Sequence, residues 1–174
     1  MPFAYYANLS APRQSIYRAS DAIEVLDLPA NVDVAKFVLA IRTGLSKADR
    51  TAVGKGCQRL VDALAIGYDV PPVKVLVLAQ RPSDDYGELH GLYEPEEDGE
   101  PTKITVWMRT ARRDQVVAFK SFLRTLVHEL GHHLDYELFH LPETFHTEGF
   151  YKRESTLANA LLALLPPLLP SPVT

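Results

Sequence analysis

The chain has 174 residues, of which 47% are apolar and 23% charged, and its formal net charge is −4 with neutral histidines. This length suits one domain with a hydrophobic core, and the composition is that of an ordinary globular protein. The acidic balance gives no overall attraction to nucleic acid or to an anionic membrane, so neither is an expected partner. A local basic cluster is interpreted as the solvent-exposed start of a helix. Its members are Arg109, Arg112, Arg113, Lys120 and Arg124.

The sequence also favours a cytoplasmic location. Cys57 is the only cysteine, so no intrachain disulfide is possible and an oxidising compartment is not indicated. The first eight residues, MPFAYYAN, lack the basic and apolar regions of a signal peptide. The longest apolar stretch, 157–169, is interrupted by Asn159 and two prolines, and is too short to span a bilayer.

In chain order, the first predicted element is a short helix over 13–20, which follows a Ser-Ala-Pro start. Apolar residues recur at helical spacing from 33 to 45 and predict a second helix. Ser46 and Asp49 are then interpreted as a capping box that opens a third helix, running toward residue 67.

The second half of the chain is expected to contain a small sheet followed by two helices. Strands are predicted at 73–78, 88–93 and 104–108, with an acidic loop at 94–101. A long helix is predicted from an N-cap at Asp114 to about 139, and a last helix at 151–165. This order predicts an α+β fold. We expect one domain over 1–174, with an N-terminal extension at 1–30 and an extended tail at 166–174.

The predicted long helix carries His128-Glu129-Leu130-Gly131-His132, an H-E-x-x-H match. Histidines four residues apart lie about 40° apart around a helix axis and one turn apart along it. Both imidazoles can therefore reach one zinc ion at the usual distance of about 2.0–2.1 Å. Glu129 lies on the flank of that face, where it can reach a metal-bound water.

The face that carries the two histidines is not the main apolar face. At ~100° per residue, the opposite side holds the apolar arc Phe119, Leu123, Leu126, Leu130 and Leu134. Two other interpretations stay open: core histidines with satisfied hydrogen bonds, and an ordinary solvated face. Asp135 is either a partner of a ligating imidazole or a solvated carboxylate. Gly131 costs roughly 1 kcal/mol relative to alanine, which indicates that a strand, a substrate or the sheet packs closely on that turn.

A catalytic zinc site needs a third protein ligand and an open position. We favour His146, because the loop after Pro142 is long enough to turn the chain back toward the helix. Glu154 on the last helix is the alternative, and would give a site with two histidines and one glutamate. Glu143 and Glu148 are further candidates. His140 is interpreted as too far along the helix axis, and His133 as pointing away from the pair.

With these residues in place, the segment 104–165 resembles the zincin metallopeptidases, and more narrowly the SprT-like and other minimal zincins. The resemblance implies an α+β zincin-like domain with N-terminal helices, a small twisted and mainly antiparallel sheet, a long active-site helix and a C-terminal helix. It implies that the strand 104–108 is the edge strand above the active-site helix, to which a peptide substrate adds as a further strand. It also implies Zn²⁺ as the cofactor, held by His128, His132 and His146.

The implied function is that of a zinc metallopeptidase that hydrolyses peptide bonds in a peptide or protein substrate. Glu129 would be the general base for a zinc-activated water. Tyr151 is either an additional donor to the oxyanion or a packing tyrosine. Two alternatives remain: a zincin-fold binding or regulatory module with little turnover, and a helical interaction protein with a chance motif. No oligomeric state is predicted.

Overall fold

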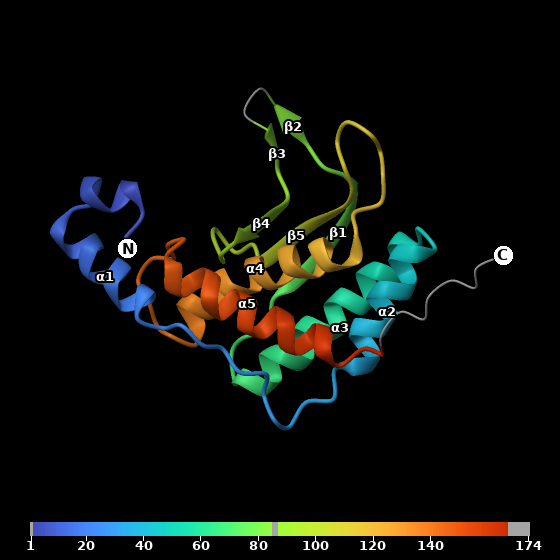
Figure 1. Cartoon of the computed structure of the whole chain (residues 1–174), viewed down its shortest axis with the longest axis horizontal. Helices are drawn as coiled ribbons and strands as arrows, with labels where there is room; N and C mark the ends of the chain where they lie inside the picture. Colours follow the sequence, from blue (N-terminus) through green and yellow to red (C-terminus); the bar gives the residue numbers. More distant parts are fainter. Residues whose placement is uncertain (1, 85–86, 167–174) are drawn as a thin grey trace.

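The computed structural model describes residues 2–84 and 87–166, and it confirms a single-domain α+β fold (Figure 1). Of the tail predicted at 166–174, all but residue 166 lies outside the described part. The helical elements are η1 (Ala4–Asn8), α1 (Ala11–Asp21), α2 (Ala35–Ser46), α3 (Arg50–Tyr68), α4 (Phe119–Glu137) and α5 (Glu148–Ala163). The strands are β1 (Lys74–Gln80), β2 (Ser83–Asp84), β3 (Gly87–Glu88), β4 (Gly91–Glu94) and β5 (Lys103–Arg109).

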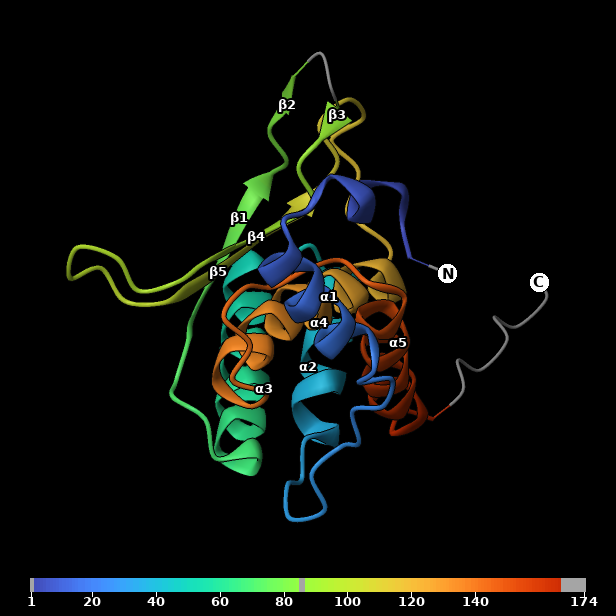
Figure 2. The same cartoon turned by 90° about the vertical axis from the view of Figure 1, so that its left-hand side faces the viewer.

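The main sheet has the strand order β1-β5-β4, and a separate hairpin of β2 and β3 extends from it. β1 pairs with β5 in parallel, with Val75 opposite Ile104, and β4 pairs with β5 antiparallel, with Gly91 opposite Val106. The sheet is therefore mixed, and its longest pairing is parallel, whereas a mainly antiparallel sheet was predicted. Figure 2 shows the sheet lying across one side of the bundle of helices.

The prediction that the strand 104–108 is the edge strand is wrong. β5 is the central strand, and the edge strand beside α4 is β4. The physical reason is visible in the burial of β5, because all five residues from Ile104 to Met108 are buried, as in a strand with neighbours on both sides. β4 has only four residues and exposes Leu92, which suits an edge.

Two predicted helix starts also differ from the structure. Asp114 does not cap α4, because it adopts a positive φ of 49° and the following Val117 N–H bonds back to the Met108 carbonyl at 2.8 Å. After β5 the chain therefore turns at 111–113 and pairs back with the end of β5 through Val116, and α4 begins at Phe119. The capping box at Ser46 is wrong as well, since Ser46 ends α2 and Asp49 is itself the N-cap of α3, accepting from the Ala52 N–H.

The predicted apolar arc of α4 faces the core, on the side of the helix opposite His128 and His132. Leu123, Leu126, Leu130 and Leu134 are buried in the core, and α4 packs against β4, β5 and α5. A Cβ atom at Gly131 would lie 3.1 Å from the Phe150 ring, so the close neighbour at this turn is α5. Among the described residues, no helix is both long enough and apolar enough to cross a bilayer.

The N-terminal segment, residues 2–30, packs against the start of α5 (Figure 2). The Gly149 N–H donates to Asp21 Oδ1 at 2.9 Å, and a Cβ atom at Gly149 would lie 2.7 Å from the carbonyl carbon of Asp21. Arg13 pairs with Glu143 at 2.8 Å across the same junction. Residues 2–30 are thus an integral part of the packed domain, next to the loop that carries His146.

Candidate metal centre

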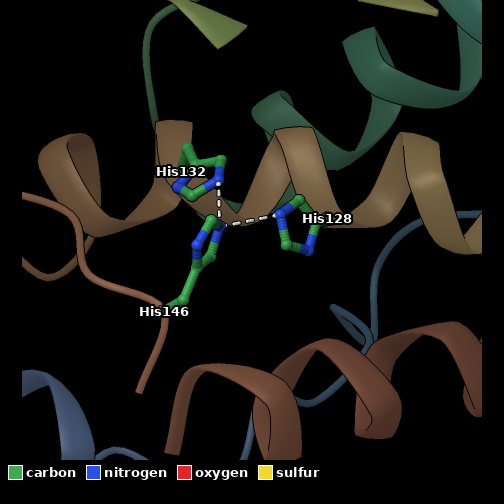
Figure 3. A group of neighbouring side chains, drawn as sticks. All are labelled: His128, His132 and His146. Atoms are coloured by element: carbon green, nitrogen blue, oxygen red, sulfur yellow. Dashed lines mark hydrogen bonds between the residues drawn. The ribbon is translucent and has the colours of Figure 1, made fainter. Parts of the chain in front are cut away.

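His128, His132 and His146 come together at the surface of α4, as Figure 3 shows. The ring centroids of His128 and His132 are 4.9 Å apart, one turn apart along α4. His146 lies in the loop between α4 and α5, and its Nε2 is 3.0 Å from Nε2 of His128 and 3.1 Å from Nε2 of His132. The three Nε2 atoms therefore converge on one point.

This convergence fits a zinc ion. Two Zn–N bonds of about 2.0–2.1 Å at a tetrahedral angle place the two nitrogens about 3.3–3.4 Å apart. The spacings around His146 fall short of this by only a few tenths of an ångström. The donor set has the right chemistry as well, since imidazole nitrogens are among the usual ligands of zinc and three of them leave a fourth position open.

The Nδ1 atoms of the two helix histidines also have hydrogen-bond partners. His128 Nδ1 lies 2.8 Å from Glu154 Oε2, and His132 Nδ1 lies 2.7 Å from Thr144 Oγ1. A carboxylate accepts only, so a neutral His128 carries its proton on Nδ1 and turns the lone pair of Nε2 toward the other histidines. Glu154, the alternative third ligand, is thus placed behind His128, on the side away from the three converging nitrogens.

Burial keeps His132 and His146 in the neutral form that binds metals. Burial and, after it, the positive charges of His128, His146 and Arg153 together lower the pKa of His132 to about 3. Burial and the charge of His128 likewise lower the pKa of His146, against the opposing effect of Glu154. A neutral imidazole has a free lone pair, so these two side chains need not lose a proton before they bind a metal ion.

Glu129 is buried beside the histidines, beneath β4. A Cβ atom at Gly91 would lie 2.7 Å from Glu129 Cγ, so any larger residue at this position of β4 would require the Glu129 side chain to shift. Burial raises the pKa of Glu129 to about 7, with His128 and the Tyr93 N–H lowering it and Glu154 raising it. A carboxyl group with a pKa near 7 is well matched to proton transfer at neutral pH.

The three histidines and Glu129 open into a single cleft of about 690 Å³. Its walls are β4 on one side and the loop and first turn of α5 on the other, and its floor is α4. Tyr151 stands on the α5 side, 41% exposed, with its ring stacked 5.8 Å from that of His146. Tyr136 also lines the cleft. The cleft is therefore open to solvent beside the exposed His146, near the point on which the three Nε2 atoms converge.

The remaining candidates lie outside the cluster. Glu143 pairs with Arg13, and Glu148 pairs with Lys152 at 3.5 Å on α5. His140 is exposed just beyond the end of α4. His133 is buried on another side of α4, where its Nε2 lies 2.9 Å from the Pro71 carbonyl oxygen and its Nδ1 lies 3.3 Å from the Tyr93 hydroxyl.

Some residues that shape the site were not singled out in the sequence. Gly91 and Tyr93 lie in the segment predicted as the strand 88–93, but only the pairing of the sheet brings them over Glu129. Thr144 was not predicted either, because only the fold of the loop brings its hydroxyl to His132 Nδ1. Asp135 is fully buried and accepts from Thr144 Oγ1 at 2.8 Å, so it is linked to His132 through the threonine.

Comparisons with known proteins identify no relative. No protein-family model, no curated protein and no solved structure matches this chain.

Proposed function

We propose that this protein is a zinc-dependent metallopeptidase of the zincin type. The observation that carries the proposal is the convergence of three imidazole Nε2 atoms on one point, with a buried carboxyl group beside them in the same open cleft. The H-E-x-x-H spacing alone occurs by chance in many chains. The addition of His146 from a separate loop, with Nδ1 partners behind the two helix histidines, is what supports a metal centre here.

His128, His132 and His146 would hold a zinc ion, which would supply a Lewis acid for the scissile carbonyl and lower the pKa of a water toward about 7. Glu129 accepts the proton of the attacking water and then delivers it to the leaving amine. Glu154 holds the His128 ring from behind at 2.8 Å. Tyr151, exposed at the rim, is proposed as an additional donor to the developing oxyanion.

The proposed substrate is a peptide or protein, because β4 lines the cleft and is an edge strand, and an extended chain can pair with such an edge. The cytoplasm is the proposed location, since the single cysteine, Cys57, is buried and no disulfide framework can form within the chain.

The test is Glu129→Gln, with Glu137→Gln as the matched control on the same helix outside the cleft. Zinc content is measured by mass spectrometry, and hydrolysis with a fluorogenic peptide library. We expect Glu129→Gln to retain zinc and to lose about 10²–10⁴-fold in kcat/KM, whereas Glu137→Gln keeps both. Full hydrolysis by Glu129→Gln would rule out the mechanism. Zinc without hydrolysis in the wild type would favour the binding or regulatory module.

A further inference from the structure

A chain of buried polar contacts runs from His132 through α5 into the N-terminal segment. His132 Nδ1 lies 2.7 Å from Thr144 Oγ1, and the Thr144 hydroxyl donates to Asp135 Oδ2 at 2.8 Å. The other oxygen of Asp135 accepts from Arg153 at 2.5 Å. Asp135 and Arg153 are 0% and 2% exposed, which makes this ion pair one of the most deeply buried polar contacts in the described residues.

The proton positions along this chain follow from the chemistry of its members. Arginine stays charged in proteins, and a neutral Asp135 would leave the buried guanidinium of Arg153 without a counter-charge. Asp135 is therefore a carboxylate, which can only accept. Thr144 has one hydroxyl proton and gives it to Asp135, so its oxygen is left to accept from His132. His132 must then carry its proton on Nδ1, and its Nε2 lone pair faces the other two histidines.

Arg153 is held in turn by the N-terminal segment. Its guanidinium donates to the carbonyl oxygens of Ser20 and Ile23, at 2.9 and 3.0 Å, and to the Ser20 hydroxyl at 3.0 Å. These hydrogen bonds fix the orientation in which the guanidinium also donates to Asp135. Residues 20–23 are therefore connected to His132 by hydrogen bonds alone, through Arg153, Asp135 and Thr144.

We propose that Thr144 is a positioning residue that holds His132 in its Nδ1–H tautomer with Nε2 directed at the metal, and that Asp135 and Arg153 orient Thr144 from the N-terminal segment. This inference rests on the proposed metal centre. The two helix histidines are thus oriented in different ways. The carboxylate of Glu154 alone orients His128. His132 is oriented by a relay of Thr144, Asp135 and Arg153, and Arg153 is in turn bonded to Ser20 in the N-terminal segment.

The affinity test compares Thr144→Val, which removes the acceptor at nearly constant shape, with Thr144→Ser, which keeps a hydroxyl. Thr156→Val on α5 is the matched control, because within the described part of the chain its hydroxyl bonds only the Lys152 carbonyl, at 2.9 Å. Zinc dissociation constants are measured by competition with a chromophoric chelator. We expect Thr144→Val to bind zinc about 10–100-fold more weakly, Thr144→Ser to stay within about threefold, and the control to match the wild type.

A second readout needs no metal. Long-range ¹⁵N–¹H spectra of the zinc-free protein report which ring nitrogen of His132 carries the proton. We expect Nδ1–H in the wild type and in Thr144→Ser, and an increased share of Nε2–H in Thr144→Val. A purely structural role for Thr144 would lower the melting temperature without changing the tautomer. Because the wild-type spectrum is informative alone, the test stands even if Thr144→Val does not fold.

The outcomes separate the two proposals. Nε2–H on His132 in the zinc-free wild type overturns the role of Thr144, as does a Thr144→Val protein that binds zinc as tightly as the wild type. A wild-type protein that binds no zinc overturns the metal centre itself, and the role of Thr144 with it. Weaker zinc binding in Thr144→Val together with a changed tautomer supports the relay.

Discussion

The wall of the cleft formed by β4 contacts the proposed general base directly, whereas the wall formed by residues 144–154 contacts the helix histidines. On the β4 side, backbone approaches Glu129, with Gly91 packed on its side chain and the Tyr93 N–H bonded to it. On the opposite side, side chains of Thr144 and Glu154 reach the Nδ1 atoms of the histidines. The β4 wall can therefore affect proton transfer, and the wall at 144–154 can affect metal binding.

The two walls are also supported by different parts of the chain. β4 is held by its antiparallel pairing with β5, within the same sheet. The wall at 144–154 is held by the N-terminal segment, through Arg153, Gly149 and the backbone of His146. Substitutions that act on only one wall should therefore separate turnover from zinc affinity.

Among substitutions in the two walls, the largest expected effect is that of Gly91→Ala in β4. The new methyl group would lie 2.7 Å from Glu129 Cγ, and Glu129 can move because it is a flexible side chain. Gly91 has no positive φ, so alanine brings no backbone strain. We expect kcat/KM to fall about 10²-fold, as for a catalytic group displaced by about 1 Å, while zinc affinity stays at the wild-type value.

Steady-state kinetics and chelator competition on the same preparations test this expectation. Gly54→Ala is the matched control, since its nearest neighbour would be Val77 Cβ at 3.9 Å. In the interior of α3, this change should stabilise the protein by about 0.5–1 kcal/mol without altering kcat/KM. Unchanged turnover in Gly91→Ala would show that β4 does not position Glu129.

The helix histidines were predictable because their relation is local. A spacing of four residues on a helix brings His128 and His132 to one face whatever the rest of the chain does. His146 could be favoured over Glu154 only by the length of the loop. The α+β class followed from the order of elements, and the structure confirms it.

The features that the sequence did not predict depend on contacts between distant segments. The central position of β5 results from parallel pairing with β1, and no local pattern specifies which edge a strand will use. Gly91 matters only because β4 crosses Glu129, and Ser20 only because Arg153 reaches back to it. Asp114 resembled an N-cap in composition, yet the following residues pair with the end of β5, and α4 begins only at Phe119.

A smaller effect is expected at the junction between the N-terminal segment and α5. In Gly149→Ala, the added methyl group would lie 2.7 Å from the Asp21 carbonyl carbon, and backbone cannot move aside as a side chain can. We expect a loss of about 1–3 kcal/mol in the free energy of unfolding, as for overpacking in a close-packed region. Urea denaturation of the zinc-free protein measures it, with Gly54→Ala again as the control. A loss of less than about 0.5 kcal/mol would show that this junction adjusts freely.

The smallest expected effect is that of Tyr5→Phe, which removes one hydrogen bond from the N-terminal segment to the wall at 144–154. The Tyr5 hydroxyl donates to the His146 carbonyl oxygen at 2.7 Å, and Tyr5 is 38% exposed. A partly exposed hydrogen bond of this kind contributes about 0.5 kcal/mol, which corresponds to about a twofold change in zinc affinity.

The matched control is Tyr68→Phe, which removes a similar bond from a hydroxyl to the Asp27 carbonyl oxygen at 2.8 Å, far from the histidines. Both variants should lose comparable stability, but only Tyr5→Phe should weaken zinc binding. Equal zinc affinities in the two variants would mean that the backbone of His146 is held sufficiently by its own loop. The N-terminal segment would then act on the metal centre only through Gly149 and Arg153, and the two walls would differ less than the structure indicates.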